Sequence, residues 1–516
     1  MDQETTSLVV SLLFPFLVST LILYIFLRRH HKSSSSRSLK LPPSPPRLPI
    51  IGNIHQLSPI LHQSLESLAQ KYGPVMMIHI GSKPVLIISS SDAAEQVLRR
   101  NDLNFLDRAQ PTYIGKLSYD FKDMIFQPYG DYWRQLRFIC VSQLLSNKRV
   151  QSFRSIREQE IGKVLENIRK SCVSAGTTGS IICLSEIVTT LTSNILSLVV
   201  LGKRHSGEEG NNGSHKLSSA LNLIAGQVNI GDYIPCLGWI NHINGMEKKV
   251  NRVAKEVDEY LEGIIEQGLK KQETNEVDVN GEGQQNFLDV LLQLQREENA
   301  NLHRDSIKAI LLNMMLAGAE TTYSLMEWTF SQLMRNPNVM AKLQGEVRQK
   351  PGRKLGQMIT EDDLDSLPYL KAVIRETLRT NPPVTLLNRV SKEAVKIMEY
   401  DVAAGSEVFI NVKVIGRDPL LWEEADVFRP ERFLNSPVDV KGQHFEYLPF
   451  GSGRRICPGS SLALTTAQLT LANLIHNFNF ALPNNAKPDE LDMSEGHGMV
   501  TKRKIPLVLV ASLPSS

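Results

Sequence analysis

The stretch of residues 301–336 constrains the fold of this chain more than any other segment. As one helix at about 1.5 Å per residue it would be roughly 50 Å long, and its middle is apolar on nearly all sides. A helix of this kind must lie buried at the centre of a large body, where other elements cover its faces. The chain has 516 residues, of which 42% are hydrophobic, and this is enough to build such a body.

Polar residues interrupt the apolar middle of this predicted helix. Glu320, Thr321 and Thr322 follow Gly318 there, and a buried carboxylate or hydroxyl costs free energy unless it is paired or takes part in chemistry. A threonine hydroxyl can bind the carbonyl four residues earlier, and a glycine loosens the turn, so we expect a local bulge. These residues are therefore either tolerated core threonines with a neighbouring acid, or part of a reactive site.

The remainder of the body is predicted to be mainly helical with a minor β portion. Residues 75–81 and 84–90 are short β-branched runs separated by a Gly-Ser-Lys turn, which predicts a hairpin. Residues 250–269 carry an apolar stripe at helical spacing with charges between. Two polar segments, 204–216 and 270–285, are predicted to be surface loops. The fold class is therefore mainly α with minor β (α+β), in one body.

The first 30 residues are predicted to form a membrane anchor. Residues 7–27 carry no charge and, as a helix, match the roughly 30 Å hydrocarbon core of a bilayer. Acidic Asp2 and Glu4 precede this run and basic residues 28–32 follow it, an order that differs from a cleaved signal peptide. The basic flank predicts a single-pass helix with a lumenal N-terminus and a cytosolic body. The alternative, a buried soluble helix, would normally show a polar face.

Residues 31–50 are predicted to form a neck between the anchor and the body. The segment is basic and Ser-rich at first, and five prolines between residues 42 and 49 then enforce an extended backbone. It is either an unstructured linker or a semi-rigid spacer that fixes how the body sits on the membrane. The chain is thus divided into an anchor (1–30), a basic, Ser- and Pro-rich neck (31–50) and a body (51–516).

Charge and cysteine usage argue against three classes of protein. The chain has 57 Lys plus Arg against 54 Asp plus Glu, a net charge of +3, so no dedicated nucleic-acid surface is expected. The cysteines are scattered, without zinc-ligand spacing or a disulfide framework. They are Cys140, Cys172, Cys183, Cys236 and Cys457.

Cys457 stands out among these cysteines because of its surroundings. It ends a Gly-rich turn, and Pro458 occupies a position typical of the first residue of a helix. A helix N-terminus, together with Arg454 and Arg455, is expected to lower the pKa of the thiol and favour the thiolate. Gly451, Gly453 and Gly459 leave room for something flat and large to approach the backbone. Cys457 could then be a metal ligand or a nucleophile, and the alternative is an inert buried cysteine.

Residues 450–459, Phe-Gly-Ser-Gly-Arg-Arg-Ile-Cys-Pro-Gly, resemble the FxxGxRxCxG haem-binding signature of the cytochrome P-450 family. The resemblance implies the fold of that family with a long central distal helix. It also implies haem b with Cys457 as the axial thiolate, Arg455 paired with a propionate, and Phe450 packed beside the sulfur. Gly453 and Gly459 would complete the cofactor-binding turn.

Three further motifs are similar to those of the same family. Ala-Gly-Ala-Glu-Thr-Thr at 317–322 resembles its oxygen-activation motif, in which Glu320 and Thr321 would supply protons; the family more often has Asp at position 320. Trp133 and Arg137 resemble the WxxxR helix that reaches the haem propionates, although such a pair could equally stack at the surface.

Glu376 and Arg379 lie three residues apart, which alone predicts an ordinary surface pair on a helix. With the segment Phe-Arg-Pro-Glu-Arg-Phe at 428–433, they resemble the family's ExxR and PERF motifs. The resemblance implies a buried structural charge network of Glu376, Arg379 and Arg432. Downstream, residues 382–389 are one residue shorter than the family's usual segment and lack its Pro before Arg389.

By position in the family, the substrate pocket would be lined by the loop of residues 111–126, the distal helix, residues 384–387 and the segment 499–500. The individual residues predicted to line it are Asn313, Leu316, Ala317, Val384, Thr385, Met499 and Val500. The apolar character of these walls indicates a lipophilic ligand.

The function that these features predict is a haem-thiolate monooxygenase of the endoplasmic reticulum membrane, similar to plant microsomal enzymes of specialised metabolism. It would oxidise a lipophilic terpenoid, phenylpropanoid, coumarin or alkaloid with dioxygen. NADPH electrons would come through a membrane-bound reductase, with a small cytochrome as a further donor. One alternative is a haem-thiolate isomerase, cyclase or dehydratase that needs no dioxygen, and another is a non-catalytic, membrane-tethered binding protein.

Overall fold

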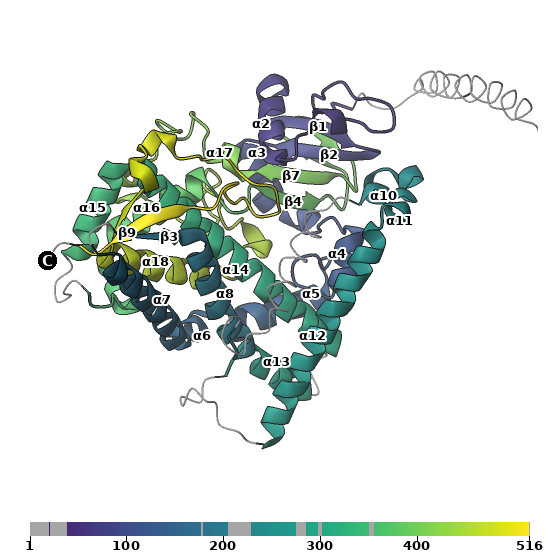
Figure 1. Cartoon of the computed structure of the whole chain (residues 1–516). Helices are drawn as coiled ribbons and strands as arrows, with labels where there is room; N and C mark the ends of the chain where they lie inside the picture. The colour runs from purple at the N-terminus through teal and green to yellow at the C-terminus, as the bar shows by residue number, and fades with distance from the viewer. Residues whose placement is uncertain are drawn as a thin grey trace, which may run out of the picture.

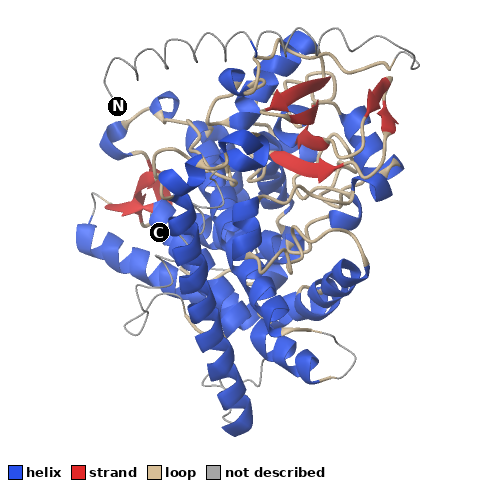
Figure 2. Cartoon of the chain, turned by 90° about the vertical axis from the view of Figure 1, so that its right-hand side faces the viewer, coloured by secondary structure: helices blue, strands red, loops and turns tan. Residues whose placement is uncertain are grey.

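A computed structural model describes residues 39–176, 179–204, 229–274, 285–297, 302–349 and 356–514, together with residue 20. Helices form most of the body, and the strands lie toward its margins (Figure 2). This confirms the prediction of a mainly α fold with a minor β portion. The predicted anchor of residues 7–27 lies, apart from residue 20, outside the described residues.

The longer helices build the core. They are α2 (Leu61–Tyr72), α7 (Arg154–Ala175), α8 (Leu184–Leu201), α12 (Met246–Thr274), α13 (Phe287–Arg296), α14 (Arg304–Arg335), α15 (Pro337–Arg348), α16 (Pro368–Thr380) and α18 (Ser460–Asn477). The shorter ones are α3 (Ser91–Glu95), α4 (Thr112–Leu117), α5 (Asp131–Phe138), α6 (Asn147–Ser152), α10 (Ile230–Tyr233), α11 (Ile240–Ile243) and α17 (Val412–Ile415).

The central helix predicted from residues 301–336 is confirmed as α14. It crosses the middle of the body (Figure 1), and α8, α16 and α18 pack against it. The expected bulge at Gly318 is absent, because α14 is α-helical throughout. Gly318 has a different role: a Cβ there would lie 2.9 Å from the Leu196 side chain, so the glycine lets α8 approach closely.

The strands of the described residues form three small sheets. They are β1 (Val75–Ile80), β2 (Lys83–Ile88), β3 (Ser180–Cys183), β4 (Leu386–Val390), β5 (Val395–Ile397), β6 (Tyr400–Val402), β7 (Glu407–Asn411), β8 (Asn479–Ala481) and β9 (Val508–Ser512). The largest sheet has the order β1-β2-β7-β4, and its antiparallel β1–β2 pair is the predicted hairpin. The other sheets are β3-β9-β8 and β5-β6.

The apolar stripe predicted within residues 250–269 is confirmed in α12, where Val250, Val257 and Ile265 are buried. The predicted loop of residues 270–285 is wrong at its start, because α12 continues to Thr274. The Lys, Gln and Glu residues there are good helix formers and extend the helix beyond its apolar stripe. Residues 275–284 and 205–216 of the two predicted loops lie outside the described residues.

Part of the predicted neck packs on the body. The Met77 amide in β1 donates to the carbonyl of Pro43 at 2.8 Å, and the Asn53 side-chain amide donates to the carbonyl of Pro46 at 3.1 Å. Among the described helices, α8 alone is long and apolar enough to cross a membrane, and 67% of it is buried inside the body. It is therefore a core helix here.

Candidate active site

A cavity of about 300 Å³ lies between the middle of α14 and the loop that leads into α18. The structure brings ten of the residues predicted for the site to its walls. They are Trp133, Arg137, Asn313, Ala317, Thr321, Val384, Phe450, Arg455, Cys457 and Gly459. The walls are otherwise largely apolar, with contributions from α8, α16 and β4.

Cys457 lines this cavity, and the residue is exposed to the cavity space although its thiol lies deep within the protein. Its backbone amide donates to the carbonyl of Phe450 at 2.9 Å, which closes the turn. Helix α18 begins at Ser460, two residues later than the predicted start at Pro458, but the amides of Gly459 and Ser460 still point toward the sulfur. The described residues that line the cavity include no His, Asp or Glu, so a nucleophilic cysteine would lack a general base.

The predicted lowering of the Cys457 pKa is wrong for the protein chain by itself. Burial raises the pKa of this thiol above its ordinary value. The amides of Gly459 and Ser460, together with Arg137 and Arg108, act in the opposite direction but do not overcome burial. A coordinated metal ion would hold the thiolate in such a place.

The three glycines of the turn have two different roles. Gly451 and Gly459 line the cavity, as expected if a flat group approaches the backbone there. Gly453 does not; its φ is +70°, and a Cβ would lie 2.7 Å from the carbonyl oxygen of Leu98. Gly453 is therefore required by backbone packing.

Four arginine side chains meet at one side of the cavity: Arg108, Arg137, Arg389 and Arg455. In the described part of the chain, none of them forms an ion pair with a carboxylate. Arg455 donates to the carbonyls of Ile125 and Gln127 at 3.1 and 2.5 Å, and Arg137 donates to that of Ile456 at 2.7 Å. Nε of Arg108 and Nε of Arg455 are buried without a hydrogen-bond partner.

The electrostatics of this arginine cluster indicate an anionic ligand. Burial lowers the pKa of Arg455 to about 9, and repulsion from Arg108 adds to this shift. Burial also lowers the pKa of Arg108, of Arg137 and, most strongly, of Arg389. Asp107 and Asp123 act in the opposite direction on this cluster but form no ion pair with it. Clustered guanidinium groups with unpaired N–H groups therefore fit a ligand that brings two carboxylates into the cavity.

Sequence reasoning missed Arg108 in this cluster. Arg108 lies in a loop without periodicity or a recognised motif, and only the tertiary fold brings its side chain close to Arg455. Arg389 ends the shortened 382–389 segment, and β4 places it in the same cluster.

On α14, Thr321 lines the cavity, and its Oγ1 donates to the carbonyl of Ala317 at 2.6 Å. Thr322 also lines it and donates to the carbonyl of Gly318 at 2.8 Å. The neighbouring Glu320 is half-buried and lies away from the cavity walls. The structure thus brings the hydroxyl of the predicted acid–alcohol pair to the site, and not the acid.

Four residues predicted for the substrate pocket lie outside this cavity: Leu316, Thr385, Met499 and Val500. Thr385 is buried, with its Oγ1 3.2 Å from Nδ1 of His62, and the Met499 side chain is 55% exposed. Leu316 packs against the main core instead. The role of these four residues in substrate binding therefore stays a prediction.

Glu495, His62 and Lys413 form a buried charged group close to the segment of Val384 and Thr385. Glu495 is 2.7 Å from Nε2 of His62 and forms an ion pair with Lys413. Burial alone would raise the pKa of Glu495, but His62 and Lys413 lower it to about 2. Thr385 contacts His62 and directly follows Val384, which lines the cavity. The charged group therefore supports the part of the cavity wall that Val384 forms.

The lowered pKa of Glu495 predicts how stability depends on pH. Its folded pKa is below the ordinary 4.5, so its contribution is present above pH 4.5 and is lost as the pH falls toward 2. We expect Glu495→Gln to lower the free energy of unfolding by about 3 kcal/mol at neutral pH. Denaturant unfolding at several pH values measures this; the difference from the parent should shrink below about pH 4. A difference that does not change with pH would contradict the assignment.

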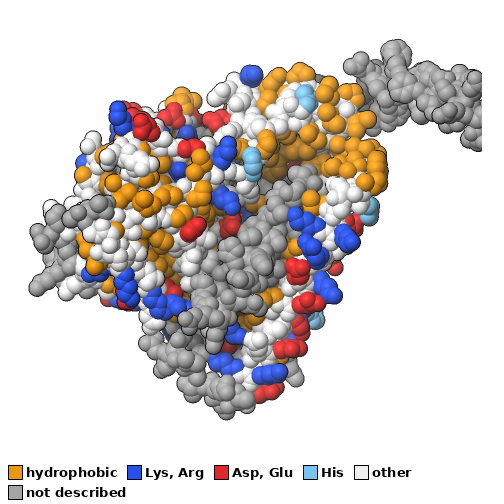
Figure 3. Space-filling model, in the orientation of Figure 1, with side chains coloured by type: hydrophobic (Ala, Val, Ile, Leu, Met, Phe, Trp, Pro, Cys, Tyr) orange, Lys and Arg blue, Asp and Glu red, His pale blue; other side chains and the backbone are white. Residues whose placement is uncertain are grey.

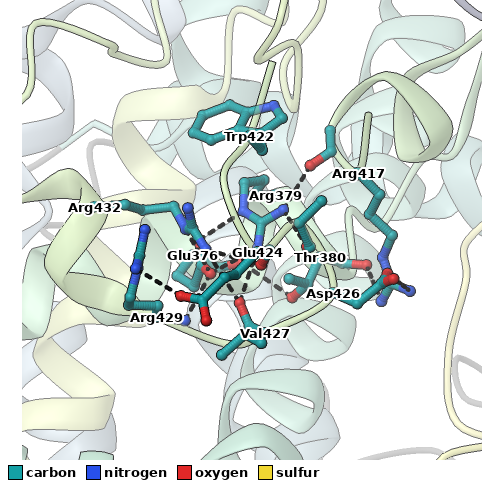
Figure 4. A network of polar contacts seen from close by, with 12 residues as sticks. Glu376, Arg379, Thr380, Arg417, Trp422, Glu424, Asp426, Val427, Arg429 and Arg432 are labelled. Carbon is teal, nitrogen blue, oxygen red and sulfur yellow. Dashed lines mark hydrogen bonds and ion pairs between the residues drawn. The ribbon is translucent and has the colours of Figure 1, made fainter. Parts of the chain in front are cut away.

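The network of Glu376, Arg379 and Arg432 is fully formed away from the cavity (Figure 4). Glu376 lies 2.7 Å from Nη2 of Arg379 and 3.0 Å from Nε of Arg432, and its exposed fraction is 0%. The ring of Trp422 covers both guanidinium groups, at 5.3 and 5.9 Å. Leu378 of the same helix lines the cavity, so the network holds that wall in place.

Comparison with known proteins agrees with this site. The cytochrome P-450 family profile matches residues 42–509, and the chain belongs to this family. It is 46% identical over 504 residues to tabersonine/lochnericine 19-hydroxylase of Catharanthus roseus, covering 97% of each chain. It is 41% identical over 505 residues to (+)-menthofuran synthase of Mentha piperita, covering 97% of this chain and 99% of that relative. The protein is therefore a monooxygenase of the cytochrome P-450 class, with haem-thiolate iron as its cofactor.

Proposed function

We propose that the protein is a membrane-anchored monooxygenase that oxidises a lipophilic plant specialised metabolite, with NADPH electrons delivered by a reductase. The observation that carries this proposal is a single thiol, Cys457, facing a cavity lined by four arginines that form no ion pair with a carboxylate among the described residues. The domain from residue 51 to residue 516 would be the haem-thiolate unit.

The residues of the cavity fit haem b. Cys457 would hold the haem iron through its sulfur, and the four arginines would pair with the two propionates, which would supply negative charge there. Trp133 supports this set: its ring lies 4.6 Å from the Arg455 guanidinium, and its Nε1 donates to the carbonyl of Met124 at 3.0 Å. When bound, the haem would supply the activation of dioxygen, with Cys457 as the thiolate that holds the iron.

Thr321 would hold and pass protons at the cavity. Its Oγ1 already donates to the carbonyl of Ala317, so it can accept a second hydrogen bond from a water molecule on the cavity side. Glu320 is half-buried on α14 and would supply protons to that water molecule rather than contact the reacting atoms. Asn313, Ala317 and Val384 would contact the substrate, because all three line the cavity.

The cavity walls and the relatives support one class of substrate. The cavity is predominantly apolar, which suits a lipophilic molecule held by few polar contacts. The names of two relatives refer to tabersonine and menthofuran, and a third relative, 43% identical over 499 residues, is norfluorocurarine oxidase of a Strychnos species. We infer an alkaloid or a terpenoid, with phenylpropanoids and coumarins as further candidates.

The proposed location is the endoplasmic reticulum membrane, with the body in the cytosol. The charge-free run of residues 7–27 supports an anchor. Hydrophobic side chains gather at the upper right of the face in Figure 3, and Leu41, Leu48 and Ile50 of the neck are all exposed. Exposed apolar side chains in a segment that follows the predicted anchor in the sequence are suited to contact with lipid. The partners would be an NADPH-dependent reductase and a small cytochrome donor.

The proposal is tested with the full chain in membranes that contain the reductase. Alkaloids and terpenoids are supplied with NADPH under isotopically labelled dioxygen, and one labelled oxygen atom is expected in the product. Turnover of a substrate without dioxygen would instead favour the haem-thiolate isomerase or dehydratase. The presence of Thr321 at the cavity favours the monooxygenase, because proton delivery is needed to use dioxygen.

Thr321→Val should separate binding from chemistry. The variant keeps the volume of the side chain but loses the hydroxyl, so we expect the carbon-monoxide spectrum to be retained. Product formed per NADPH is expected to fall about a hundredfold, with hydrogen peroxide released instead. Thr189→Val serves as a matched control, because its hydroxyl donates to the carbonyl of Ser185 outside the cavity. Unchanged product yield in Thr321→Val would contradict the proton role.

A further inference from the structure

The turn formed by Tyr119, Asp120 and Phe121 has an unusual backbone. Their φ angles are 54°, 56° and 61°, in the left-handed region that residues other than glycine adopt at an energetic cost. Contacts within the turn support it: the Phe121 amide donates to Ser118 Oγ at 3.2 Å, and the Asp120 amide donates to the carbonyl of Gly115 at 2.9 Å. Three such residues in succession persist only where surrounding contacts enforce the conformation.

Side chains from two other helices hold the first residue of this turn. The Tyr119 hydroxyl donates to Oδ1 of Asp258 in α12 at 2.9 Å. Lys308 of α14 donates to the same oxygen at 2.6 Å, and its Nζ lies 5.6 Å from the centre of the Tyr119 ring. Glu262 also binds Lys308, at 2.6 Å. We call Tyr119, Asp258 and Lys308 the clamp.

The protonation states of the clamp suit this role. Burial and the hydrogen bond to Asp258 raise the pKa of Tyr119, so its hydroxyl remains a donor. Burial alone would lower the pKa of Lys308, but Asp258 and Glu262 raise it, so the ammonium group stays charged.

The clamped turn leads directly into the cavity wall. Asp123, which is fully buried, accepts the amides of Ile125 and Phe126 at 2.6 and 2.9 Å. Met124 and Ile125 line the cavity, and the Ile125 carbonyl accepts a hydrogen bond from Arg455. The segment from 122 to 127 is thus held at one end by the strained turn and at the other by the arginine cluster.

We propose that the clamp enforces the strained turn and thereby positions Met124 and Ile125, so that it limits how fast small molecules enter and leave the cavity. Tyr119, Asp258 and Lys308 are positioning residues, because none of them lines the cavity. The inference rests on the proposed function in one respect: a bound haem serves as the optical reporter.

The test uses the haem-loaded full chain and imidazole as the probe. Association and dissociation rates are measured by stopped flow from the Soret change, for the parent, Tyr119→Phe and Asp258→Asn. Both variants should keep a thiolate-type carbon-monoxide spectrum while both rates rise about fivefold, the factor that loss of one ordinary hydrogen bond gives. The dissociation constant should change much less than either rate, because entry and exit are opened together.

Two further variants make the test specific. Tyr369→Phe removes a comparable hydroxyl, which donates to Glu431 at 3.1 Å away from the cavity, and should leave both rates unchanged. Adding Asp120→Gly to Tyr119→Phe relieves the backbone strain at an exposed position and should restore slow exchange.

Unchanged rates in both clamp variants, with intact spectra, would overturn the clamp and leave the proposed function standing. Rates that rise equally in Tyr369→Phe, or that Asp120→Gly fails to restore, would also overturn it. A parent protein without a thiolate-type spectrum would instead contradict the proposed function.

Discussion

Replacing Cys457 by Ser is expected to abolish NADPH-dependent oxidation of every substrate. Cys457 provides the sole thiol among the described residues that line the cavity. A serine hydroxyl stays protonated near neutral pH and is a poor ligand for iron, so the variant would lose the thiolate that drives the chemistry. Turnover with reductase measures this loss.

The fold should survive this substitution, because the Cys457 side chain faces the cavity rather than the packed core. Thermal unfolding of the variant is therefore expected to resemble that of the haem-free parent. Cys236→Ser is a matched control, since Cys236 is exposed and is not among the residues that line the cavity, and it should retain full turnover. Turnover of Cys457→Ser at the level of this control would contradict the ligand assignment.

Replacing Glu376 by Gln is expected to lower the free energy of unfolding by about 3–5 kcal/mol. The carboxylate is the anionic partner of Arg379 and also binds Arg432, and its removal leaves buried positive charge uncompensated. The Glu376 carboxylate also accepts the backbone amide of Arg429 at 2.8 Å, so the turn that carries Arg432 loses an anchor as well. Denaturant unfolding of the full chain in detergent measures the change.

Glu423→Gln is the control for this prediction. Glu423 pairs with Arg429 at 2.8 Å in the same region, but its side chain is 81% exposed, so water compensates for the loss. No measurable change in stability is expected there. Equal stability of the two variants would show that the buried network is not what holds α16 and its cavity wall.

Local motifs explain which parts of the site could be predicted from the sequence. The Cys457 turn, the central helix and the residues of the charge network are each defined by a few neighbouring residues or by helical spacing. The structure brings Cys457, Arg455 and Thr321 to one cavity and joins Glu376 to Arg379 and Arg432. The α12 stripe and the β1–β2 hairpin followed in the same way from periodicity and turn residues.

The parts that sequence reasoning missed depend on direction and on distant contacts. Thr385 follows Val384, but in extended backbone neighbouring side chains point to opposite sides, and Thr385 therefore meets His62. Glu320 precedes Thr321 on α14, where each residue is rotated by about 100° from the one before, so Thr321 and Thr322 line the cavity and Glu320 does not. Arg108 becomes recognisable only when the fold places it beside other cations, and the left-handed turn at 119–121 contains no glycine to signal it.

The carbon-monoxide difference spectrum of the reduced full chain tests the central claim most directly. It reports together on the presence of haem, on its thiolate ligand and on the oxidation state of the iron. We predict a red-shifted, thiolate-type Soret band in the parent that is absent in Cys457→Ser. A folded parent protein without this band, or a variant that keeps it, would contradict the assignment of Cys457 as the ligand of a haem-thiolate monooxygenase.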